Sequence, residues 1–179
     1  MKRTRLDFSK HDLTVKHCDC TVIYHLAKPN TIVDSVKFIN TNGILAVTGD
    51  YGNWIFCREF HPKENGSVSD GYWMEKLQIA STQKPEEYDS DATRAEIQRR
   101  LADNEDPPTD EEKEYYESLL RCVDDEFEYT CTAYNDKPSD MDWEYIPMIR
   151  KTKYWLEVVF DAFEEICSRL KEDSCSTKS

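Results

Sequence analysis

Glycine is confined to one short stretch of this 179-residue chain. All five glycines lie between Gly43 and Gly71, and none follows. Because glycine supplies the positive-φ positions of tight turns, this stretch favours short hairpins. A long segment without glycine favours helices joined by longer connections. The sequence therefore predicts an α+β protein, in which an N-terminal antiparallel β-sheet is packed by C-terminal amphipathic helices.

The region from about residue 13 to residue 61 has the composition of antiparallel strands. Thr21–Tyr24 is β-branched and aromatic, and Asn42-Gly43 stands between two apolar runs, which is a strong hairpin signal. In the expected strand Trp54–Phe60, the aromatic residues alternate onto one face. We expect a meander of three or four strands.

The region from residue 69 to residue 171 has the signals of helices. Ser69 and Asp89 are suited to cap helices, and Thr109 with Glu112 matches the capping box. The expected helices place these apolar residues at helical spacing: Trp73, Leu77 and Ala80; Ile97 and Leu101; Leu119, Leu120 and Val123.

The segment 126–134 fits two periods. Phe127, Tyr129, Cys131 and Ala133 alternate as in a strand, while Phe127, Cys131 and Tyr134 have the spacing of a helix. We favour the helix.

The clearest helix is the last one. Its apolar residues follow a 3.6-residue period over more than four turns, and acids occupy the opposite face. We expect this helix to pack on the sheet and residues 172–179 to form a loose polar tail, within a single domain spanning residues 1–179. The apolar stripe consists of Leu156, Val159, Phe160, Phe163, Ile166, Cys167 and Leu170.

Negative charge is concentrated in residues 86–144. This region holds 21 acids and six bases, in a chain of net charge −13. Such a charge repels phosphate backbones and anionic lipids, so we expect neither direct nucleic-acid binding nor membrane binding.

No stretch is long and apolar enough to span a membrane, and the N-terminus lacks an apolar signal region. The chain has seven cysteines, an odd number, which does not favour a framework of disulfides. We expect a cytoplasmic protein with reduced thiols.

Motifs for nucleotide binding and hydrolysis are absent from the sequence, including the Walker loop, G-x-S-x-G and H-E-x-x-H. The densest cluster of reactive residue types is His17-Cys18-Asp19-Cys20 with His25, followed further on by Cys57 and His61. The candidate metal ligands are His17, Cys18, Cys20, Cys57 and His61. Their spacing is not typical of zinc sites, since Cys57 and His61 would lie about 13 Å apart on a strand. Cys18 and its neighbour His17 would point to opposite faces, which disfavours a nucleophile–base pair. We expect no metal and no cofactor.

Four aromatic residues of the N-terminal region are candidates for stacking on nucleic-acid bases. Tyr51, Trp54, Tyr72 and Trp73 have few basic neighbours in the sequence. We therefore expect them in the core or in a protein interface.

The acidic run could imitate a nucleic-acid backbone. Asp110–Glu128 holds nine acids and two bases in nineteen residues. If it formed one helix, it would be roughly 28 Å long and carry an acid about every 3 Å, close to the ~3.4 Å phosphate spacing of one DNA strand. The candidate partner-binding residues are Asp106, Asp110, Glu111, Glu112, Glu114, Glu117, Asp124, Asp125, Glu126 and Glu128.

Two segments resemble parts of uncharacterised small acidic proteins of phages and mobile elements. They are Val47–Phe56, with the sequence VTGDYGNWIF, and Val159–Cys167, with the sequence VFDAFEEIC. The resemblance implies a mobile-element origin, where small acidic proteins often inhibit host defence.

These observations favour a non-enzymatic binding protein. The most concrete version is an inhibitor of anti-CRISPR type that blocks a basic, nucleic-acid-binding surface of a host defence protein. One alternative is a metal-dependent hydrolase or nuclease that uses the N-terminal His/Cys cluster or paired acids such as Asp124/Asp125 or Asp140/Asp142. Another is a structural or regulatory phage protein whose acidity serves solubility only. The sequence leaves the oligomeric state open.

Overall fold

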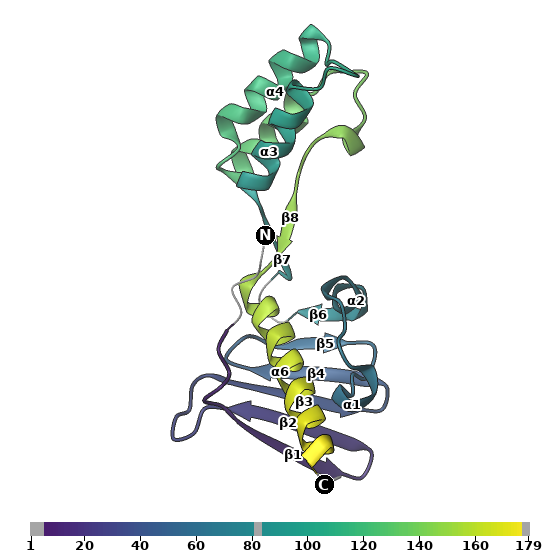
Figure 1. Ribbon diagram of the computed structural model, residues 1–179. Helices are drawn as coiled ribbons and strands as arrows, with labels where there is room; N and C mark the ends of the chain where they lie inside the picture. Colours follow the sequence, from purple (N-terminus) through teal and green to yellow (C-terminus); the bar gives the residue numbers. More distant parts are fainter. Residues whose placement is uncertain (1–5, 81–83, 177–179) are drawn as a thin grey trace. The chain divides into compact units, whose positions relative to one another are not determined.

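The computed structural model describes residues 6–80 and 84–176, except for the side chains of residues 64–65 and 173–176. The chain forms two compact units (Figure 1). The sheet unit comprises the chain up to Pro85 and from Thr152 onward, and the helical unit is Glu86–Lys151. The helical unit is therefore an insertion within the sheet unit, a division that the expectation of a single domain did not include.

The sheet unit contains a six-stranded antiparallel sheet whose strand order follows the chain order. The expected α+β class with an N-terminal antiparallel sheet is confirmed, and the sheet is larger than the three or four strands predicted. The strands are β1 (Asp12–Cys18), β2 (Thr21–Ala27), β3 (Ser35–Thr41), β4 (Ile44–Gly49), β5 (Trp54–Phe56) and β6 (Leu77–Ala80).

The hairpin at Asn42-Gly43 is confirmed. Thr41 pairs with Ile44, and the two turn residues have φ values of +48° and +83°. Both values lie in the left-handed region, which Asn and Gly adopt at low cost, and they match the right-handed twist of the flanking strands.

Two predicted boundaries were wrong near the end of the sheet. Helix α2 (Asp70–Lys76) begins at the expected cap, where Tyr72 N donates to Ser69 Oγ at 3.3 Å, but Leu77–Ala80 is strand β6. This segment pairs with β5, so its backbone groups are satisfied by the sheet instead of by a helix. Strand β5 itself ends at Phe56, and Phe60 N donates to Oδ1 of the buried Asn40 at 2.9 Å.

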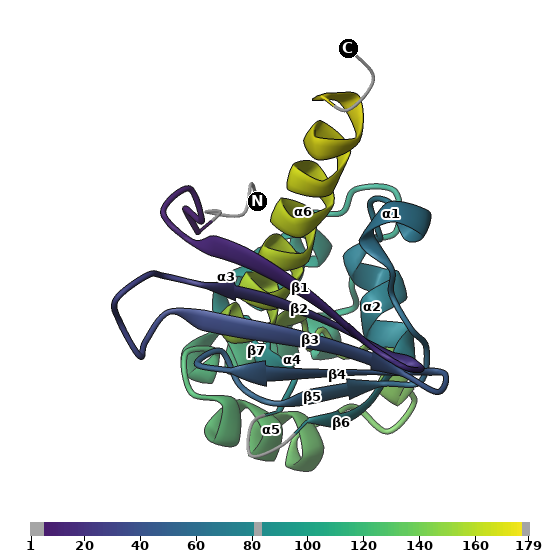
Figure 2. The ribbon, with the colours of Figure 1, turned by 90° about the horizontal axis from the view of Figure 1, so that it is seen from below.

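The core of the sheet unit lies between the inner face of the sheet and helix α6 (Tyr154–Ser176) (Figure 2). Trp73 of α2 stacks on Phe160 with ring centroids 5.3 Å apart, and it also contacts Phe163 and Phe60. Helix α1 (Pro62–Asn65) contacts α6 as well. All seven residues of the predicted C-terminal stripe are buried, which confirms that this helix packs on the sheet.

Helix α6 continues to Ser176, well into the segment predicted as a loose tail. Its last turns contain Lys and Glu, which are good helix formers even where they make no core contact. The expectation of a loose tail was therefore wrong up to this residue, and residues 177–179 lie outside the described part of the chain.

The helical unit has its own core. Strand β7 (Glu86–Tyr88) at its start pairs with strand β8 (Arg150–Thr152) at its end, and the two form a two-stranded sheet. Between these strands lie α3 (Ser90–Leu101), α4 (Asp110–Cys122), α5 (Glu126–Asn135) and the 3₁₀ helix η1 (Trp143–Tyr145). The favoured helix at 126–134 is confirmed. The buried core residues are Ile97, Tyr115, Tyr116, Leu119, Cys122, Val123, Tyr129, Ala133 and Met141.

The capping box at the start of α4 is also confirmed. Thr109 N donates to Glu112 Oε2 at 2.7 Å, and Glu112 N donates to Thr109 Oγ1 at 3.2 Å. Within residues 6–80 and 84–176, no helix is long and apolar enough to cross a membrane.

The sheet unit should fold without the insertion. Lys153 N donates to Pro85 O at 2.8 Å, so the chain leaves and re-enters this unit at neighbouring positions. We predict that replacing residues 86–151 with a short Gly-Ser linker gives a folded protein with cooperative urea unfolding, measured by circular dichroism. Loss of the cooperative transition would show that the sheet unit requires the insertion.

Candidate protein-binding surface of the helical unit

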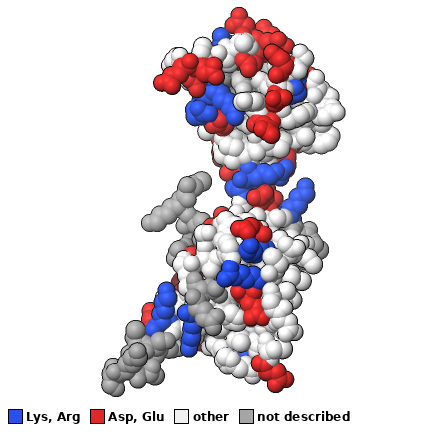
Figure 3. Space-filling view, turned by 90° about the vertical axis from the view of Figure 1, so that its right-hand side faces the viewer, with Lys and Arg blue, Asp and Glu red and all other residues white. Residues whose placement is uncertain are grey.

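The two units differ sharply in charge. The helical unit carries 21 acids and eight bases, a balance of −13 that equals the net charge of the whole chain. The sheet unit carries acids and bases in equal number. Figure 3 shows acidic side chains distributed widely over the helical unit, in the upper part of the view. The charge asymmetry seen in the sequence is therefore a difference between two folded units.

Helix α4 presents three acids on its outer side. Tyr115 and Leu119 are buried, so helical geometry places Asp110, Glu114 and Glu117 on the opposite side at i, i+4 and i+7. At 1.5 Å per residue, these three carboxylates span about 10 Å along the axis. Lys113 and Arg121 lie near the same stripe, so this surface is mixed in sign, although acids predominate.

The acidic run does not form one continuous helix. Helix α4 ends at Cys122, and Asp125 caps α5 by accepting from Glu128 N at 2.8 Å. The chain then turns back along α4, since Tyr115 Oη donates to Ala133 O at 3.1 Å. The condition for an acid about every 3 Å along a single rod is therefore not met, and the phosphate-spacing argument for Asp110–Glu128 was wrong.

Five of the ten candidate acids have structural roles in the unit. Glu112 and Asp125 cap helices, and the other three form ion pairs. The pairs are Asp110–Lys113 at 3.2 Å, Asp124–Arg94 at 2.6 Å and Glu126–Arg150 at 2.6 Å. Reversing the charge of these acids would weaken the fold as well as any interface.

The other five candidate acids are available to a partner. Their side chains are exposed and form no ion pair with another described residue. They are Asp106, Glu111, Glu114, Glu117 and Glu128.

Helix α5 carries apolar residues on two sides. Tyr129 and Ala133 face the core, while Phe127 and Tyr134 remain 79% and 71% exposed. The exposed pair is separated by seven residues, so the two rings lie on one side of the helix, with the half-buried Cys131 between them. The stripe that indicated a helix in the sequence is the one that faces solvent.

The 3₁₀ helix η1 extends this exposed surface. Trp143 is 53% exposed, and its ring centroid lies 5.4 Å from that of Tyr134. Phe127, Tyr134 and Trp143 are called the aromatic stripe from here on. Sequence reasoning missed it, because the spacing of an apolar stripe does not tell which side of a helix faces the core when both sides are apolar.

A network of hydrogen bonds holds η1 in place. Glu96 Oε1 accepts from Arg99 Nη2 and from Arg100 Nε, each at 2.8 Å, and Arg100 also donates to the carbonyl of Tyr145. The hydrogen bonds from Arg99 and then from Arg100 lower the pKa of Glu96 to about 2. In addition, the buried Tyr129 donates to Pro147 O. These hydrogen bonds fix the position of the segment that carries Trp143.

The candidate metal ligands of the sheet unit are not brought together. Cys18, Cys20 and Cys57 are exposed, and His61 Nε2 lies 2.7 Å from Glu59 Oε2. Among the described residues, no group of three or more His, Cys, Asp or Glu is placed to share a metal ion.

The N-terminal aromatic residues belong mainly to the core. Tyr51, Trp54 and Trp73 are buried, and Tyr72 is half-buried. The expectation that these residues lie in the core is confirmed for the three buried ones.

No protein-family model, no curated protein and no solved structure matches the chain. The resemblance to proteins of phages and mobile elements stays a prediction.

The Glu96 network predicts a pH-dependent contribution to stability. A carboxyl whose pKa falls on folding stabilises above its unfolded value, near 4.5, and loses that contribution as the pH falls toward 2. We expect Glu96→Gln to destabilise the helical unit at pH 7, because it removes hydrogen bonds between charged groups. The loss should be only about 1–2 kcal/mol, since the side chain is partly exposed and the ion pairs are screened. Amide hydrogen exchange in α3 measures this loss.

The difference from wild type should shrink between pH 5 and pH 2. A constant difference over this range would contradict the proposed role of the ionised carboxylate.

Proposed function

We propose that the protein is a non-enzymatic binding protein whose helical unit docks onto a basic surface of a partner protein. The observation that supports this most directly is the coincidence of two features in one unit. The helical unit holds the entire net charge of the chain, and it also exposes the aromatic stripe.

The two features supply different parts of an interaction. Exposed carboxylates accelerate the approach of a basic partner and disfavour acidic ones, but they contribute modest affinity because water and salt screen them. Large aromatic side chains supply most of the affinity in protein interfaces when they are held at fixed positions and desolvated by the partner. Phe127 and Tyr134 are held on a helix, and Trp143 lies beside Tyr134, so the rings meet the condition of fixed positions.

Solubility alone explains the charge less well. A solubilising surface needs acids but gains nothing from exposed aromatic rings, which favour association. The structural or regulatory alternative would leave the aromatic stripe without a role. The hydrolase alternative lacks a described group of metal ligands.

The finer version of the proposal concerns the partner. The resemblance of Val47–Phe56 and Val159–Cys167 to mobile-element proteins suggests a host defence protein that binds nucleic acid, with the chain acting in the cytoplasm as an inhibitor of anti-CRISPR type. Here the carboxylates would compete with phosphates for the same lysine and arginine residues.

Reversing the free acids of α4 should weaken binding. We predict that Glu114→Lys with Glu117→Lys lowers the affinity for an arginine-rich peptide at least tenfold at low salt and flattens its salt dependence, because the steering charge is lost. Isothermal titration calorimetry at two salt concentrations measures both effects.

A matched control has the same change in net charge. Asp12→Lys with Glu75→Lys places the reversals on exposed positions of the sheet unit. Equal losses in the two double variants would show that net charge alone governs binding, and no loss in either would overturn the proposal.

The aromatic stripe should contribute affinity without contributing stability. We predict that Phe127→Ser with Tyr134→Ser leaves the urea midpoint nearly unchanged, because both rings are mostly exposed. Proteins captured from host lysate by the wild type should be lost or weakened about tenfold or more with this variant.

Ile79→Ser is the control, since Ile79 is an exposed apolar residue of the sheet unit. If the control bait loses the same proteins, capture reflects general stickiness and the stripe is not the anchor.

A further inference from the structure

A cation already lies against the exposed tryptophan of the aromatic stripe. Lys137 Nζ is 5.9 Å from the centroid of the Trp143 ring, within the range of a cation–π interaction. The same ammonium donates to Pro138 O at 2.9 Å and to Met141 O. Trp143 remains 53% exposed beside it, so a large part of the indole is available to a second group.

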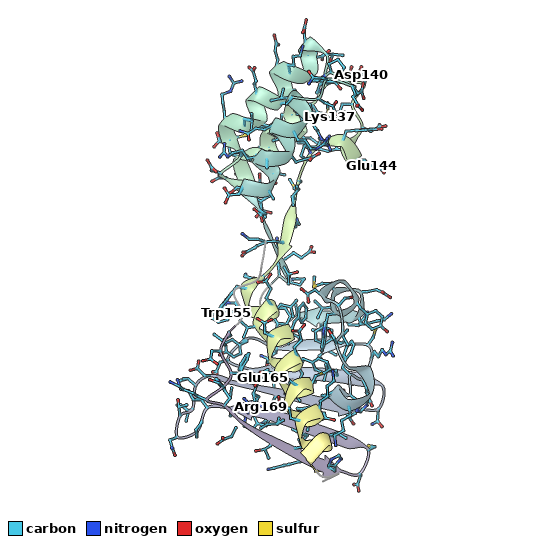
Figure 4. All side chains as sticks on the ribbon, in the orientation of Figure 1. Lys137, Asp140, Glu144, Trp155, Glu165 and Arg169 are labelled. Atoms are coloured by element: carbon cyan, nitrogen blue, oxygen red, sulfur yellow. The ribbon has the colours of Figure 1, made fainter. Side chains whose placement is uncertain are left out.

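The surroundings of this indole favour positive charge. The segment 136–144 carries four exposed acids and one base, Lys137. Figure 4 shows Asp140 and Glu144 on the same side of the helical unit as Lys137. The four acids are Asp136, Asp140, Asp142 and Glu144.

Tyr134 adds a second ring to the site. Its plane is tilted by 32° from that of Trp143, with centroids 5.4 Å apart and 71% of Tyr134 exposed. Two neighbouring exposed π-systems in a negative field form a surface that attracts a flat cation more than a neutral apolar group.

We propose that Tyr134 and Trp143 receive an arginine side chain of the basic partner. This inference rests on the proposed function and names the chemical group that the stripe recognises. A guanidinium group is flat and weakly hydrated, so it stacks on an indole while its edge N–H groups stay free to donate to carboxylates such as those of Asp140 and Glu144. A lysine ammonium is more strongly hydrated and cannot stack in this way.

The test compares two substitutions of one residue. Trp143→Phe keeps a π-face, whereas Trp143→Leu keeps apolar area but has no π-system. With a short arginine-rich peptide as probe, calorimetry should show a two- to fivefold loss for Trp143→Leu, as expected for an exposed cation–π contact, and a smaller loss for Trp143→Phe. Equal losses in the two variants would overturn the proposal, because apolar packing alone explains them.

Two further peptides test the charge and shape of the ligand. Wild type should bind a lysine counterpart more weakly than the arginine peptide, and a citrulline counterpart, which is flat but neutral, more weakly still. Trp143→Leu should reduce the difference between arginine and citrulline. A wild-type protein that does not distinguish arginine from lysine would overturn the choice of arginine.

The outcome is separable from that of the proposed function. If both Trp143 variants bind as wild type while the Glu114/Glu117 reversal still weakens binding at least tenfold, the arginine site is overturned and the acidic docking surface stands. If the reversal has no effect, the proposed function fails by itself.

Discussion

The packing of helix α6 against the sheet is the constraint on which the rest of the structure depends. Trp73 lies in a cluster with Phe160 and Phe163, and Phe163 in turn contacts Phe38 of the sheet. Burial of this apolar surface supplies the main stabilisation of the sheet unit. The sheet precedes the insertion in the chain, and α6 follows it. Packing of α6 on the sheet therefore holds the two ends of the insertion close together, and this core does not require residues of the insertion.

This arrangement separates stability from charge. The sheet unit carries equal numbers of acids and bases, so it gains no self-repulsion from the acids of the chain. The helical unit concentrates the repulsion in 66 residues and offsets part of it with caps and ion pairs, such as Asp124 with Arg94. What remains is a set of exposed acids without an ion pair or a capping role, in a unit that also exposes the aromatic stripe.

Much of the fold could be predicted from the sequence, because local signals were sufficient for the Asn42-Gly43 hairpin, the Thr109 capping box and the apolar stripe of α6. The helical spacing of Trp73, Leu77 and Ala80 was misleading, since pairing with β5 overrides a short helical pattern. The candidate site was less predictable. Which acids are free depends on pairs such as Arg94–Asp124, thirty residues apart, and which side of α5 faces solvent depends on packing against α4.

The discontinuity of the sheet unit has a consequence for synthesis on the ribosome. The six strands emerge first, yet the helix that covers their apolar face is the last element of the chain. The helical unit is continuous and rich in local contacts, so it is able to fold before α6 has been synthesised. A nascent chain therefore exposes the inner face of its sheet throughout translation of the insertion, and chaperone binding is expected to concentrate in that interval.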